Sequence, residues 1–291
     1  MNIPRVIPIM LLLLAVAAGP ASAQQTVRLG DNAALRYWSA IAQMQDAAIT
    51  SQDALEMRMI FDGTATYDDA KYKDLVEKNK LAVETMIRGT KFVTCDWGAE
   101  IEMGSDTPDE YIRKSLTLGR LNVLYGYHLL SAGDTGGAVH ALTAGLRFSR
   151  DVGNDTTLFG TLVASSLIEA HLEAINFALR APGAPLSPSQ RAVLEKALTQ
   201  LGTAGLDWHA AMKLELELTR TALTRQAAAG LARLTPAYLN AITNPSTLPA
   251  LLQTIASASP QVQDVLPSPR HVLEAKQELT DKLQQTRSLL P

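Results

Sequence analysis

The residues that could carry out chemistry are few, and the most unusual group is Cys95-Asp96-Trp97, followed by Gly98. It lies in residues 90–106, which have no helical periodicity, and functional side chains are often placed in long irregular loops. A catalytic thiol needs a histidine or a cation beside it to become a thiolate, and no histidine is near Cys95 in the sequence. The loop is therefore either reactive or a plug, in which Cys95 and Trp97 pack on helices and Asp96 caps a turn. The plug is favoured, because buried cysteines are common and catalytic ones are rare.

Two histidines are candidates for lining a cavity between helices. His171 lies on the apolar stripe of an expected helix, residues 156–180, and His128 lies on an apolar face of another, residues 107–131. If these helices are antiparallel, both histidines could face one interior, where a His-His-carboxylate metal site is conceivable. The Glu-x-x-His motif of helix-bundle metal sites is absent, and a core histidine more often makes one structural hydrogen bond. The sequence thus predicts no metal and no cofactor.

Other charged residues are expected to lie in solvent. His140, Arg147 and Asp151 share what reads as the outer face of one helix, which is typical of a solvated helix surface. Asp68 and Asp69 fit the negatively charged start of a helix. The sequence contains no nucleophile-elbow, phosphate-loop or dinucleotide-binding motif.

The elements that must position these residues are helices with short connections. Leucine and alanine dominate, and glycine and proline fall between periodic segments. Helices are expected over residues 32–46, 51–61, 67–88, 107–131, 135–152, 156–180, 187–202, 207–234 and 269–290. Prolines should restrict residues 235–269 to short helices.

The expected fold is all-α, with antiparallel helical hairpins packed as a bundle or a short tetratricopeptide-like array. Residues 127–152 resemble the turn and second helix of a tetratricopeptide repeat, although only one copy is visible. The apolar spacing of Val272, Leu279, Leu283 and Leu290 predicts a last helix that lies against a core or a partner.

The N-terminus is typical of a cleavable secretory signal. Arg5 provides positive charge, residues 6–18 are apolar, and an Ala-Ser-Ala site ends at Ala23. The apolar run is shorter than the roughly 20 residues that a spanning helix needs. We expect a signal peptide at residues 1–23 and a mature chain that is periplasmic or secreted.

No further membrane-spanning segment is expected, because the most apolar later stretch, residues 158–179, is interrupted by four side chains that are ionisable or carry an amide. They are Glu169, His171, Glu173 and Asn176.

The Pro-rich residues 181–187 are the best candidate for a boundary. We expect an N-terminal helical domain over residues 24–181 and a C-terminal helical region over 187–291 that packs on it. Hydrophobic residues make up 47% of the chain, which argues against disorder. The net charge is −3 with no basic stripe, which argues against a nucleic-acid partner. The single cysteine excludes an internal disulfide.

Residues 32–38, 95–98 and 133–170 resemble a family of exported, helical bacterial proteins of unknown function. Its members have an Asn-Ala-x-x-Tyr-like start, a Cys-Asp-Trp loop and a Leu-rich hairpin, and the resemblance covers roughly residues 30–180. A Pro-His pair of that family is replaced here by residues 109–111, Asp-Glu-Tyr. The resemblance implies that the loop and the hairpin form one unit, and it implies no activity.

We therefore expect a non-catalytic interaction or scaffold protein of the cell envelope, whose partner is another envelope protein or a peptide. This expectation depends on the helical hairpins and the absence of a catalytic motif. The alternative is an envelope enzyme, such as a hydrolase, or a small-ligand-binding protein. It would use the loop around Cys95, Asp96 and Trp97 over a cavity with His128 or His171.

Overall fold

The structure is a computed structural model that describes residues 31–45, 51–99, 103, 110–154, 157–181, 185–203 and 205–290. In this part of the chain the regular elements are all helices, and one isolated bridge joins Asn32 to Thr94. The prediction of an all-α fold is confirmed, whereas the predicted signal peptide lies outside the described residues. The elements are α1 (Ala33–Gln43), α2 (Ser51–Phe61), α3 (Asp69–Gly89), α4 (Glu110–Ser131), α5 (Thr135–Gly153), α6 (Leu158–Arg180), α7 (Pro188–Leu201), α8 (Trp208–Thr221), α9 (Arg225–Thr243), the 3-10 helix η3 (Pro245–Thr247), α10 (Leu248–Ala256), α11 (Pro260–Gln263) and α12 (Pro269–Ser288).

Side-chain caps fix where several helices begin. The Asn32 side chain accepts a hydrogen bond from the backbone N–H of Ala34, which starts α1. Ser187 and Gln190 form a complete capping box at α7, with Pro188 in the first turn. Such caps satisfy N–H groups that have no partner inside the helix. These starts agree with the helices expected over residues 32–46 and 187–202, whereas the start of the helix expected over residues 107–131 lies outside the described residues.

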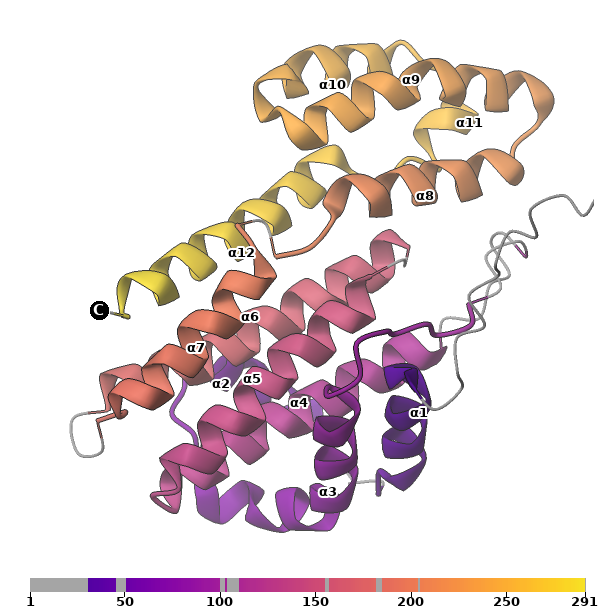
Figure 1. Cartoon of the computed structure of the whole chain (residues 1–291). Coiled ribbons are helices and arrows are strands. Elements are labelled where there is room, and N and C mark those ends of the chain that lie inside the picture. Colours follow the sequence, from indigo (N-terminus) through magenta and orange to yellow (C-terminus); the bar gives the residue numbers. More distant parts are fainter. Residues whose placement is uncertain are drawn as a thin grey trace, which may run out of the picture.

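Helices α4, α5 and α6 form the centre of the molecule, and α7 lies at one side of them (Figure 1). Helix α4 packs on both α5 and α6, and α5 packs on both α6 and α7. Helix α3 packs on α4 and also holds α1, so the N-terminal helices cover one side of this centre. Helix α6, in contrast, packs on α8 and α12 beside its contacts with α4 and α5.

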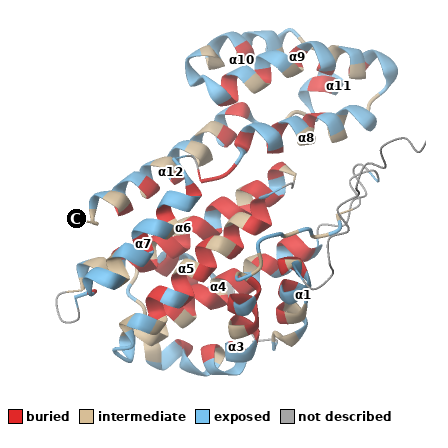
Figure 2. Ribbon diagram, in the orientation of Figure 1, coloured by how far each residue is buried: buried red, intermediate tan, exposed pale blue. Residues whose placement is uncertain are grey.

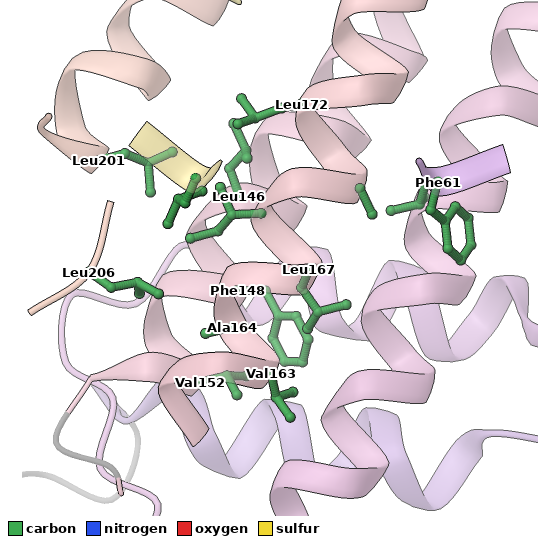
Figure 3. Packing of buried hydrophobic residues seen from close by; sticks show 14 of the residues in the cluster. Phe61, Leu146, Phe148, Val152, Val163, Ala164, Leu167, Leu172, Leu201 and Leu206 are labelled. Atoms are coloured by element: carbon green, nitrogen blue, oxygen red, sulfur yellow. The ribbon is translucent and has the colours of Figure 1, made fainter. Parts of the chain in front are cut away.

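The hydrophobic core is centred on α5 and α6 (Figures 2 and 3). Phe148 and Val152 of α5 lie beside Val163 and Leu167 of α6, and all four are buried. By length and composition α6 could cross a membrane, but 72% of its most apolar stretch is buried inside the protein. The apolar composition of α6 is therefore explained by its position as the central helix of this core.

The C-terminal helices add a second layer. Helix α12 packs on α6, α7 and α9, while α8 to α11 lie together at the top of Figure 1 and are largely exposed in Figure 2. Val272, Leu279 and Leu283 are buried, as their spacing predicted, whereas Leu290 lies after the end of α12 and is half-buried. The last helix thus packs on the core of the same chain.

The expected single helix over residues 207–234 was wrong. It is two helices, because the Thr224 side chain accepts from the backbone N–H of Ala227 and starts α9. The expectation that Pro236 interrupts a helix was also wrong, since it lies inside α9. Leu234 and Tyr238 flank it and are buried, and this packing offsets the backbone hydrogen bond that proline cannot make.

Candidate functional site

The segment that contains Cys95 is fastened to the start of α1. The Asn32 side chain donates to the backbone carbonyl of Asp96 at 2.7 Å and accepts from the backbone N–H of Asp96 at 2.9 Å. Thr94 receives a backbone hydrogen bond from Ala33 at 2.8 Å. One asparagine thus caps a helix and holds a loop that lies 64 residues later in the chain.

Cys95 and Trp97 face the C-terminal end of α5. The indole Nε1 of Trp97 donates to the backbone carbonyl of Asp151 at 2.8 Å, and the Cys95 thiol lies 4.0 Å from the same oxygen. The Trp97 ring stacks on Tyr111 with 4.9 Å between ring centroids. Asp96 is exposed, and its side chain accepts from the backbone N–H of Gly98 in a tight turn. These contacts agree with the plug interpretation.

The chemistry around Cys95 does not favour a thiolate. Burial raises the pKa of the Cys95 thiol well above its usual range, and the nearby Asp151 carboxylate adds to this rise. Arg147 opposes the shift without reversing it. A protonated thiol is a poor nucleophile, so the geometry argues against a catalytic cysteine.

Asp151 was expected on a solvated helix face, and this was wrong. Only 1% of the residue is exposed, because the loop that carries Cys95 and Trp97 covers this end of α5. Its carboxylate accepts from the Tyr37 hydroxyl at 2.7 Å and pairs with Arg147 at 2.8 Å. Burial raises the pKa of Asp151, while Tyr37 and Arg147 favour its charged form. The cluster links α1 to α5 and is structural.

His171 is fully buried between α4, α5 and α6. Its Nδ1 lies 2.6 Å from the Leu167 carbonyl oxygen, and its Nε2 lies 2.8 Å from Oδ1 of the Asn122 side chain. Nδ1 must donate to the carbonyl, so Nε2 of a neutral ring needs a donor. A 180° turn of the Asn122 amide presents its otherwise unpartnered nitrogen at that position. Burial lowers the pKa of His171 to about 4. It is a neutral core histidine.

His128 lies elsewhere and faces α3. Its Nδ1 is 2.7 Å from the carboxylate of Asp69, and its Nε2 is 3.4 Å from that of Glu77. Along α4 it is six residues beyond Asn122, about 9 Å at 1.5 Å per residue, and on a different face. The structure therefore does not bring His128 and His171 into one cavity. Among the described residues no group of three or more His, Cys, Asp or Glu side chains could hold a metal ion.

An open pocket of about 460 Å³ lies between α2, α4, α6 and α12, and no pattern in the sequence predicted it. Helices α2 and α4 contribute Arg58 and Arg120, whereas α6 and α12 contribute Glu169 and Glu278. The other lining residues are Phe61, Asp62, Leu162, Ser165, Ser166, Leu167, Ala170, His271, Ala275 and Lys282. The pocket joins the central helices to the C-terminal helix.

Arg120 is the least satisfied charge in this pocket. Its half-buried guanidinium makes no hydrogen bond or ion pair with any residue that the structure describes. Burial lowers the pKa of Arg120, and Arg58 adds to this effect while Asp62 opposes it. An arginine in this condition is a ready site for a carboxylate or a phosphate.

Glu169 is the most perturbed acid in the pocket. Its carboxylate accepts a hydrogen bond of 2.9 Å from the Ser165 hydroxyl. Burial raises the pKa of Glu169 to about 7, and Glu278 adds to this rise while Lys282 opposes it. A partly buried carboxyl that titrates near neutrality is a frequent property of binding and catalytic sites.

Comparison with known proteins finds no matching protein-family model, no matching curated protein and no matching solved structure. The resemblance of residues 30–180 to a family of exported helical proteins stays a prediction.

Proposed function

We propose that this chain is an exported, non-catalytic binding protein of the bacterial cell envelope. The observation that carries the proposal is Arg120, a half-buried cation on the wall of an open pocket. Its guanidinium forms no hydrogen bond or ion pair with the described residues. Partial burial of a charge without an opposite charge beside it lowers the stability of the folded protein, and a bound anionic group offsets that loss. The helical packing, together with the tetratricopeptide-like turn expected from residues 127–152, supports a peptide or another envelope protein as the partner.

The proposal assigns the Cys95 loop a structural role. Asn32, Tyr37 and Asp151 already engage the loop or its neighbours from α1 and α5. The geometry of the loop leaves its thiol protonated. Binding is therefore assigned to the pocket between α2, α4, α6 and α12.

A hydrolase is the second candidate, and Glu169 is the observation that favours it. A carboxyl with a pKa of about 7 can act as a general acid or base. The two candidates differ in what happens to a bound molecule. Mass spectrometry of a ligand before and after incubation separates them, because a binding protein returns it unchanged.

A thermal-shift screen of the full chain tests the proposal. Amino acids and peptides, sugars, nucleotides and fatty acids are tested against the wild type, Arg120→Met and Lys114→Met. Lys114 is an exposed cation on the same helix and is the matched control. A ligand at about 100 times its Kd stabilises the folded chain by roughly 2.7 kcal/mol. We expect one class to raise the Tm of the wild type and the control by several degrees, but not that of Arg120→Met. An equal response of all three proteins, or none, contradicts the proposal.

A further inference from the structure

We infer that the pocket binds a small amphoteric ligand of the amino acid or short-peptide class, with its carboxylate at Arg120 and its ammonium at Glu169. The inference rests on the proposed function and names the ligand class of that same pocket.

The two arginines of the pocket come from α2 and α4. Arg58 lies 3.7 Å from Asp62, and both side chains are more than half exposed, so this ion pair is weak. Arg120 forms no hydrogen bond or ion pair with the described residues. A carboxylate that enters here meets two guanidinium groups and can accept paired hydrogen bonds from Arg120.

The two glutamates of the pocket come from α6 and α12. Glu169 and Glu278 both line it, and the Lys282 ammonium, which lines it too, pairs with Glu173 at 3.6 Å. An ammonium group entering here gains from both carboxylates, and Glu169 also accepts from Ser165.

The arginines and the glutamates of the pocket do not neutralise each other. No ion pair joins Arg120 to Glu169 within the described residues, although both line the same pocket. A dianionic ligand would meet the carboxylates and a dicationic ligand would meet the arginines, and each such contact lowers affinity. The charge pattern therefore selects a molecule with one charge of each sign at its two ends.

The size and the wall of the pocket fit a peptide of two or three residues. Its volume of about 460 Å³ falls in the range of small-molecule sites. Phe61, Leu162 and Ala275 give the pocket apolar surface beside the charged groups. Small apolar side chains of a short peptide can cover that surface while its ends reach the charges.

Affinity should depend on pH in a bell shape. The ammonium site needs ionised Glu169, whose pKa is about 7, and a peptide α-amino group loses its proton near pH 8. Maximal binding is expected between these two values. The charged or titratable groups that line the pocket around Glu169 are Arg58, Asp62, Arg120, His271, Glu278 and Lys282.

The test is isothermal titration calorimetry of the full chain with dialanine, N-acetyl-dialanine and dialanine amide. Dialanine should bind the wild type and Lys114→Met alike, and blocking either end should weaken binding at least tenfold. Arg120→Met should bind dialanine at least tenfold more weakly and no longer distinguish it from the amide. Glu169→Gln should no longer distinguish dialanine from its N-acetyl form. Circular dichroism of each variant confirms that it is folded.

Three results overturn the inference: no dialanine binding at millimolar concentration, equal binding of all three probes, or binding that both variants leave unchanged. The thermal-shift screen separates this failure from that of the proposed function. If another ligand class requires Arg120, the proposed function stands and only the amphoteric ligand is rejected. If no class requires Arg120, both are rejected.

Discussion

His171 and Asn122 are hydrogen-bonded across the contact between α6 and α4, 2.8 Å apart, in a space that exists because residue 145 of α5 is glycine. A Cβ atom at position 145 would collide with the His171 ring and with the Asn122 amide. This polar pair sits in the most buried part of the core and so fixes how three helices meet.

Gly145→Ala should therefore lower the free energy of unfolding by about 3 kcal/mol, from steric overlap and from disruption of a buried hydrogen bond. Gly136→Ala in the same helix is the matched control. A Cβ atom there meets nothing nearer than 3.7 Å, so alanine should be neutral or stabilise by up to about 1 kcal/mol. Urea unfolding measures both variants. Equal stabilities would show that the glycine is not required.

The buried histidine should make the protein sensitive to acid. In the unfolded chain a histidine binds a proton near pH 6.5, but folded His171 does so only near pH 4. Stability from this residue is fully present above pH 6.5 and falls as the pH drops towards 4, by about 3 kcal/mol in total. His171→Gln should be less stable at pH 7 and lose this part of the pH dependence. A parallel pH profile for both proteins would contradict it.

Glu169 should affect the pH dependence of stability in the opposite direction to His171. Its folded pKa of about 7 lies above the usual value of 4.5, so the folded state holds the proton more tightly and stability falls as the pH rises from 4.5 to 7. Glu169→Gln removes this loss and should be more stable than the wild type at pH 8 by about 2 kcal/mol. Glu217→Gln, at an exposed position of α8, should change nothing. Chemical unfolding at pH 5 and pH 8 measures all three proteins, and a variant that is less stable than the wild type at pH 8 refutes the prediction.

Asn32 should contribute to stability through both its helix cap and its loop contacts. Asn32→Ala loses the cap of α1 and two hydrogen bonds to Asp96, and we expect a loss of about 2 kcal/mol. Asn32→Ser retains a capping oxygen but is too short to bind the loop, so it should lose about half as much. Equal losses in the two variants would mean that the loop contacts contribute nothing measurable.

The Cys95 thiol should react slowly in the folded protein. Its pKa is raised by burial, so little thiolate forms at pH 8. Iodoacetamide should modify the folded chain at least tenfold more slowly than the urea-unfolded chain, as followed by intact mass. Labelling of the folded chain at the unfolded rate would contradict the structural role of the loop.

The fold was accessible from the sequence where local signals suffice. Asn32 and Ser187 mark helix starts by their own side chains, and the leucine spacing of the last helix predicts its buried stripe. These features depend only on residues within one or two helical turns.

The pocket and the buried acid were not accessible in this way. Asp151 follows the pattern of an exposed helix face, and it is buried by a loop from more than 50 positions earlier. Arg120 and Glu169 each look like an isolated charge on a long helix. Their importance comes from the placement of α2 and α12 over α4 and α6, which periodicity in a single sequence does not encode.

Native mass spectrometry of the chain recovered from the cell envelope tests most directly whether the binding site is the pocket or the cysteine loop. The wild type, Cys95→Ser and Arg120→Met are compared after the same purification. The account predicts the same additional small-molecule mass on the wild type and on Cys95→Ser, and its loss from Arg120→Met. An additional mass that depends on Cys95 and not on Arg120 would contradict the account, as would a bare chain from all three proteins.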